Sequence, residues 1–163
     1  MRRILLLALL QLLLTEVSAQ TQRPRIVFFD ETVMSETRAT EIAELTRQKF
    51  WGRVPGFGRK TPLQPRSEEE RQSIPLPQWD LLFIALSASY AADAKRCGIA
   101  AGDEQLFRLQ NMFLPKYKDE IQVQFAFAFS IMIFSDVIAR LKDQKCSLER
   151  VDALQKGIDF VAK

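Results

Sequence analysis

The sequence predicts an all-α protein, a compact bundle of four to five helices packed around one central apolar helix and closed by one disulfide. Three observations predict this class. The stretch from about 119 to 145 would be apolar on every side of a helix, as a central helix should be. Residues 77–97 repeat large apolar side chains every three or four positions, which is the period of a helix face. The chain also has two cysteines, Cys97 and Cys146, and each lies beside the end of an expected helix.

The central stretch also carries a pattern that favours a strand. From 121 to 133, large apolar residues alternate with smaller or polar ones, as in a half-buried strand. The alternative is therefore an α+β fold in which residues 26–29 and 121–131 are strands. Helix is favoured because the run is longer than the usual strand of about 5–6 residues. It also continues without a turn residue into a lysine-rich end, which suits the negative end of a helix dipole.

The start of this central helix has a plausible cap. Asp119 can accept a hydrogen bond from the first turn, and Gln122 stands three residues later, at the spacing of a capping box. A membrane span is disfavoured because polar and charged residues, including Asp136 and Arg140, lie inside the stretch or close to its ends.

The N-terminal residues have the pattern of a secretory signal peptide. Two arginines precede an apolar run from Ile4 to Leu14, and Val17 and Ala19 occupy the −3 and −1 positions of a cleavage site. We therefore expect cleavage after Ala19, so that residues 1–19 are removed. Residues 20–163 are expected to form one domain in the periplasm or outside the cell.

The first helix of this domain is expected from Ser35 to Trp51. Ser35 is a favoured N-cap, and Gly52 ends the apolar pattern. Residues 52–77 are rich in proline and glycine and should form a long loop. Within that loop, Ser67 begins a capping-box pattern that predicts one short helical turn.

Three further helices follow from caps and periodicity. The helix at 77–97 is followed by Gly98, which suits the left-handed conformation just after a helix end. A shorter helix at 103–114 should end at Pro115, and Ser147 should cap the last helix. The helix at 77–97 is expected to face the core with one stripe of side chains: Trp79, Phe83, Leu86, Tyr90, Ala94 and Cys97.

The two cysteines are expected to form a structural disulfide. In an exported protein an even pair of cysteines is typically bridged. A bridge from Cys97 to Cys146 would close a loop of about 50 residues and contribute roughly 4 kcal/mol on the chain-entropy model. A catalytic thiol is disfavoured, because the chain has neither a C-x-x-C pattern nor a histidine to activate a thiolate.

The composition disfavours catalysis and nucleic-acid binding. With no histidine, the commonest general base and metal ligand is absent from the chain, and we expect no catalytic residue, no metal and no cofactor. The net charge of +3 comes from 23 basic and 20 acidic residues that are interspersed, so no nucleic acid is expected as a partner. Asp93 and Asp136 interrupt apolar stretches, and we expect each to pair within its own helix, with Arg96 and Arg140 as candidate partners.

These expectations predict a non-catalytic, exported cell-envelope protein, an accessory or immunity-type factor that binds another envelope protein and has no stable membrane span after signal cleavage. An alternative is a histidine-free, carboxylate-dependent hydrolase or lyase that acts on cell-wall polymer. A third possibility is a small-ligand carrier with an apolar pocket among Trp79, Phe83, Phe125 and Phe129. The candidate partner-binding residues place basic groups beside aromatic ones in and next to the long loop: Trp51, Arg53, Phe57, Arg59, Lys60 and Arg66.

Overall fold

The computed structural model describes residues 30–52 and 62–161, and every regular element in this part of the chain is a helix. The fold is therefore all-α, as predicted. The alternative strand at 121–131 is wrong, because these residues lie inside a helix, and the candidate strand at 26–29 lies outside the described residues. The helices are α2 (Glu36–Phe50), α3 (Glu68–Gln72), α4 (Gln78–Arg96), α5 (Gly102–Lys116), α6 (Glu120–Leu141) and α7 (Leu148–Val161).

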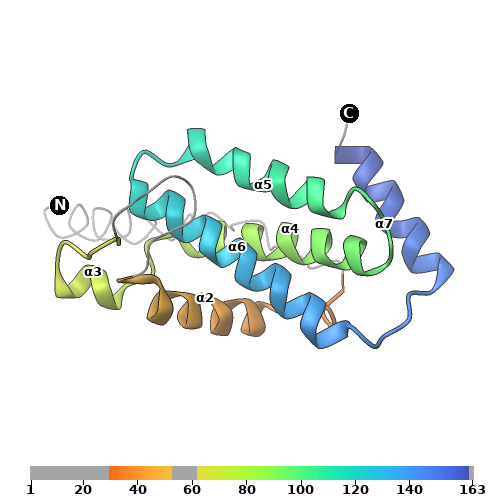
Figure 1. The fold of residues 1–163 in the computed structure, drawn as a ribbon, viewed down its shortest axis with the longest axis horizontal. Coiled ribbons are helices and arrows are strands. Elements are labelled where there is room, and N and C mark those ends of the chain that lie inside the picture. Colours follow the sequence, from red (N-terminus) through yellow and green to blue (C-terminus); the bar gives the residue numbers. More distant parts are fainter. Residues whose placement is uncertain (1–29, 53–61, 162–163) are drawn as a thin grey trace, which may run out of the picture.

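Helices α2, α4, α5 and α6 make the body of the bundle (Figure 1). Helix α6 crosses over α4, while α2 and α5 lie on opposite sides of this central pair. Helices α4 and α5 run in opposite directions, as do α5 and α6, so α4 and α6 run the same way. The short α3 lies at one end of the bundle, and α7 packs at the other end, where α4 finishes.

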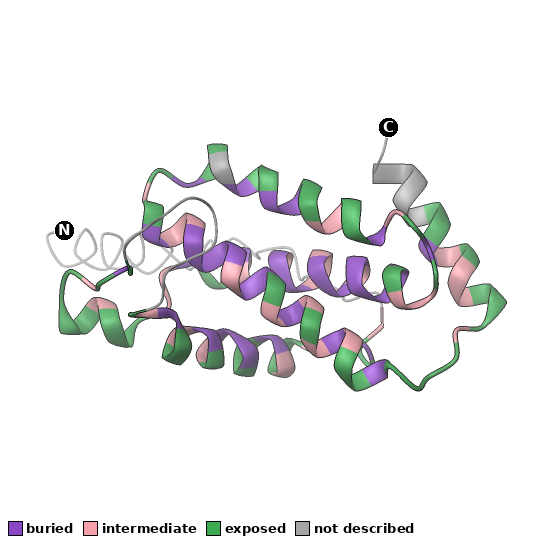
Figure 2. Cartoon of the chain, viewed as in Figure 1, coloured by how far each residue is buried: buried purple, intermediate pink, exposed green. Residues whose placement is uncertain are grey.

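Helix α6 forms because its apolar residues suit a helix that is surrounded by others. Its predicted N-cap is confirmed: Asp119 Oδ1 accepts a hydrogen bond of 2.9 Å from the Ile121 N–H. Phe125, Phe129 and Ile133 follow at four-residue spacing, and none of them is exposed. The Phe125 ring stacks on Phe129 at 6.3 Å. Figure 2 shows that burial is concentrated on α4 and α6.

Two details of α6 differ from the predictions. Gln122 does not complete a capping box, because its side-chain amide donates to the Pro75 carbonyl at 3.0 Å. The helix also ends at Leu141 rather than near 145, since the following residues turn back to bring Cys146 to α4. Among the described residues, α6 is the one helix long and apolar enough to cross a membrane, although half of its most apolar window is buried within the bundle.

The core-facing side of α4 differs from the predicted stripe. Ile84, Ala85, Ala88 and Ala92 are completely buried, whereas the large side chains of the stripe, such as Trp79, are only partly buried. Alanine allows neighbouring helices to approach closely, so the small residues occupy the tightest contacts. The larger side chains of the predicted stripe are left on the flanks of the helix.

The caps of α2 and α4 are confirmed. Ser35 Oγ accepts a hydrogen bond from the Arg38 N–H at 3.2 Å, and α2 ends at Phe50, one residue before the predicted end. Gly52 and Gly98 have φ values of +76° and +79°, the left-handed conformation that glycine adopts without strain. Ser67 likewise caps the single turn predicted within the long loop, which is α3.

Helix α5 lies close against α4 at its first residue, Gly102. A Cβ atom on Gly102 would lie 2.6 Å from the Lys95 nitrogen and 2.8 Å from the Ala91 carbonyl oxygen, so only glycine fits here without a shift. The predicted end at Leu114 is two residues too early. Pro115 is accommodated in the last turn, and the helix ends with Lys116.

The predicted disulfide is confirmed: Cys97 at the end of α4 is bonded to Cys146, which precedes α7. Ser147 caps α7 by accepting a hydrogen bond from the Arg150 N–H at 3.2 Å. Among the side chains of α7 that the structure describes, Leu154 packs against Ala94 and Ile99 in a cluster separate from the main core. The bridge and several polar contacts also attach α7 to the bundle.

Candidate functional site

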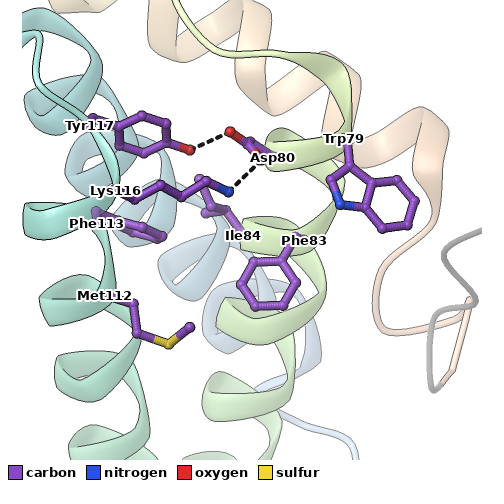
Figure 3. A pocket seen from close by; sticks show the side chains of 8 residues that line it. All are labelled: Trp79, Asp80, Phe83, Ile84, Met112, Phe113, Lys116 and Tyr117. Carbon is purple, nitrogen blue, oxygen red and sulfur yellow. Dashed lines mark hydrogen bonds and ion pairs between the residues drawn. The ribbon is translucent and has the colours of Figure 1, made fainter. Parts of the chain in front are cut away.

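A surface groove lies between the first half of α4 and the last turns of α5 (Figure 3). It encloses about 230 Å³ and is open to solvent on one side. Five of its residues are apolar, and the other three, Asp80, Lys116 and Tyr117, form a polar cluster at one end of it. The groove is lined by Trp79, Asp80, Phe83, Ile84, Met112, Phe113, Lys116 and Tyr117.

The groove opens at the end of the α4–α5 pair that is far from Gly102. At Gly102 the two backbones touch, whereas at the other end large side chains such as Phe83 and Met112 separate them. The same pair of helices is therefore tightly packed at one end and hollowed at the other.

The apolar residues that line the groove become more exposed from its floor to its rim. Ile84 and Phe113 form the floor and are buried, at 0% and 2% exposure. Trp79 and Phe83 are partly buried on the α4 side, and Met112 on the α5 side is 54% exposed. An apolar group that enters the groove would therefore contact aromatic walls and remove Met112 from water.

The polar end of the groove is organised around Asp80. Asp80 is buried, and each of its carboxylate oxygens has one donor: the Lys116 ammonium at 2.6 Å and the Tyr117 hydroxyl at 2.7 Å. The Lys116 ammonium also lies 5.6 Å from the centre of the Tyr117 ring, within reach of a cation–π contact. Burial, followed by the hydrogen bond and the charge of Asp80, raises the pKa of the Tyr117 phenol, which therefore remains a protonated donor.

This arrangement supports binding better than acid–base chemistry. Hydrolysis of a glycosidic bond uses two carboxyl groups that flank the bond. The groove lining contains one carboxylate, Asp80, and both of its oxygens are already hydrogen-bonded. In the part of the chain that the structure describes, no three acidic or cysteine side chains are grouped as metal ligands.

A second polar cluster lies beneath α7. Asp93 is 1% exposed and accepts hydrogen bonds from Arg96 at 2.7 Å and from Arg150 at 2.7 Å. Arg150 also binds Asp30 at 2.7 Å, and Arg96 donates to the Gln144 carbonyl at 2.5 Å. The predicted pairing of Asp93 with Arg96 is confirmed, while Arg150 and Asp30 join it from distant parts of the chain. The cluster holds α7 and the start of the described chain against α4.

The predicted pairing of Asp136 with Arg140 is also confirmed, although Asp136 is only partly buried. Asp136 pairs with Arg140 one turn along α6, at 3.4 Å. A closer partner, Arg38 of α2, was not predicted and lies 2.6 Å from the other carboxylate oxygen. This ion pair links α2 to α6, so its part in the molecule is structural.

Two of the six candidate partner-binding residues lie in the described part of the chain, and both contact other parts of the protein. Trp51 packs edge-on against Phe50 at 4.9 Å and donates to the Arg71 carbonyl at 3.2 Å. Arg66 binds Glu70 at 2.8 Å and Asp119 at 2.6 Å. Neither lines the groove. The other four residues lie outside the described residues: Arg53, Phe57, Arg59 and Lys60.

The apolar pocket considered from the sequence is divided in the structure. Trp79 and Phe83 line the groove, but Phe125 and Phe129 are fully buried in the core. Sequence reasoning did not single out Asp80, Met112, Lys116 or Tyr117 as site residues. Only one signal in the sequence could have pointed to them: an acidic residue in the first turn of one helix and a Lys-Tyr pair at the end of the next.

No protein-family model, no curated protein and no solved structure matches this chain. The groove is therefore described from its own geometry.

Proposed function

We propose that this protein is a non-catalytic protein of the cell envelope, an accessory or immunity-type factor, that acts by binding another protein. In this proposal the groove between α4 and α5 receives an apolar side chain of the partner. The supporting observation is the groove itself, which has a buried apolar floor, aromatic walls and the half-exposed Met112 at its rim.

The size of the groove favours a protein partner over a small ligand. Small-molecule sites usually enclose about 300–1,000 Å³ and bury most of the ligand. This groove encloses about 230 Å³ and is open on one side. That space suits one or two side chains of a partner whose remaining contacts lie on the surrounding surface. Trp, Tyr and Met are also enriched at the centres of protein interfaces.

Export is supported by the covalent structure of the chain. Disulfides persist in oxidising compartments and are rare in the cytosol. The Cys97–Cys146 bridge is therefore consistent with the predicted signal peptide at residues 1–19, which lies outside the described residues.

Substitution at the rim of the groove tests the proposal. Met112→Arg would place a charge at the mouth of the groove without altering the core, because this side chain is half exposed. The matched control is Asn111→Arg, the same charge on the neighbouring exposed residue, which does not line the groove. Each purified protein is immobilised and incubated with a membrane-and-periplasm extract of the native organism.

We expect a partner that the wild type and Asn111→Arg retain and that Met112→Arg loses, while thermal melts of all three proteins remain similar. If all three retain the same proteins, or if none retains any, the groove is not a partner-binding site.

A further inference from the structure

At the polar end of the groove, the donor Lys116 is exposed to an incoming molecule, whereas the acceptor Asp80 is buried. The Asp80 side chain is 10% exposed and the Lys116 side chain is 47% exposed, although the two form one ion pair. Both oxygens of Asp80 are already bonded. A lysine ammonium has three N–H donors, and one of them is directed at Asp80. A partner would therefore meet the cation of this pair.

We infer that the partner segment carries an acidic side chain next to its apolar anchor, so that the carboxylate binds Lys116 while the anchor fills the groove. This inference rests on the proposed function. It names the chemistry of the partner: an apolar residue such as Leu or Phe with an Asp or Glu beside it.

The position of Lys116 favours this pairing. Its ammonium is held by Asp80 at 2.6 Å and over the Tyr117 ring at 5.6 Å. A lysine that is already positioned loses less side-chain entropy when a carboxylate binds. A hydrogen bond between two charged groups is also about twice as strong as one between neutral groups. A basic partner residue would instead meet the exposed cation and be repelled, which gives the groove specificity.

Selection from a random peptide library displayed on phage tests the inference. The purified baits are the wild type, Lys116→Gln, Lys116→Arg and the matched control Lys118→Gln, an exposed lysine two residues away that does not line the groove. Phage that also bind the Met112→Arg variant are discarded. The best peptide is then synthesised in two forms, with its acidic residue and with the corresponding amide, and both are titrated against the wild type.

We expect the wild type, Lys116→Arg and Lys118→Gln to select an apolar residue with an acidic neighbour, and Lys116→Gln to select the apolar residue without the acid. The amide form of the peptide should bind the wild type about tenfold more weakly, because one charge-assisted contact is lost. This titration uses the wild-type protein and so does not depend on how well any variant folds.

The outcomes separate the inference from the proposed function. Apolar peptides whose acidic residue can be replaced by the amide without loss of affinity would overturn the inference and leave the proposed function standing. A wild type that selects no peptide over Met112→Arg would overturn both. Dodecanoate, a fatty acid, is titrated against the wild type in parallel. Binding of dodecanoate without binding of any selected peptide would identify a lipid carboxylate as the occupant and would also overturn both.

Discussion

Asp93 on α4 and Arg150 on α7 lie 57 positions apart in the sequence and form an ion pair of 2.7 Å. The same carboxylate binds Arg96, and the same guanidinium binds Asp30. This chain of charges joins α7 to α4 and to the start of the described chain.

Replacing Asp93 with Asn should lower the free energy of unfolding by about 3 kcal/mol, the usual cost of breaking a buried ion pair. The reason is that Arg96, whose side chain is 7% exposed, would be left without its counter-charge. Urea denaturation measures the change. Asp152→Asn is the control, since its pair with Lys156 is largely exposed and should contribute less than about 1 kcal/mol. Equal effects of the two substitutions would contradict the structural role of Asp93.

Removal of the disulfide should loosen α7 before the rest of the bundle. The Cys97→Ala, Cys146→Ala double variant should lose roughly 4 kcal/mol on the chain-entropy model for a loop of this length. Hydrogen exchange should accelerate most at residues 148–156, which directly follow the bridged Cys146, and least in the middle of α6. Ellman's reagent should find no free thiol in the native protein, and the detection of two thiols would refute the bridge.

Whether Gly102→Ala raises or lowers the free energy of unfolding tests the close approach of α4 and α5. Within a helix alanine is normally more stable than glycine, by up to about 1 kcal/mol. Here the added Cβ would meet the Lys95 nitrogen at 2.6 Å, and a backbone atom cannot move aside as a side chain can. We therefore expect a loss of about 1–3 kcal/mol, typical of overpacking.

Asn111→Ala is the control for this substitution, because it lies on the exposed face of the same helix and should not destabilise the protein. A stabilised Gly102→Ala variant in thermal or urea unfolding would mean that α4 and α5 are farther apart than the structure has them.

The contribution of Asp30 should depend on pH. The hydrogen bond from the Thr32 side chain, and then that from Arg150, lower the pKa of Asp30 to about 2. Since the folded pKa lies below the unfolded value of about 3.9, the stabilisation is complete above about pH 4 and is lost as the pH falls towards 2.

Asp30→Asn should therefore be less stable than the wild type by about 1 kcal/mol at neutral pH, after allowance for partial exposure. The difference between the two proteins should shrink below about pH 4, because the wild type then loses the same charge. Urea titrations at several pH values measure this difference. A difference that stays constant down to pH 2 would show that the carboxylate charge of Asp30 does not contribute.

Much of the fold follows from local signals in the sequence. Ser35, Asp119 and Ser147 each cap the helix that they were expected to cap, and all three hydrogen bonds lie within three residues along the chain. The disulfide was predictable because the chain offers one pair of cysteines. Helix caps and a single possible cysteine pair can be predicted without knowing which helices are neighbours.

The groove could not be predicted in the same way, because it depends on which helices meet and how closely. Periodicity placed Trp79 and Phe83 on one face of α4 but could not show that the alanines beside them occupy the close contacts. Asp80 and Tyr117 are 37 positions apart, and nothing in the local sequence joins them. The close approach of Gly102 to Ala91 and Lys95 is likewise a contact between helices.

The bridge between Cys97 and Cys146 has a consequence for how the chain matures. Two cysteines allow a single intramolecular pairing, so oxidation needs no isomerase to correct a wrong bridge, and the competing product is a covalent dimer. Cys146 follows α2 to α6 in the sequence, so the thiols can meet only after all four helices of the bundle have been synthesised. The disulfide therefore forms late, after the described residues of the main core, which end at Leu141, have been synthesised.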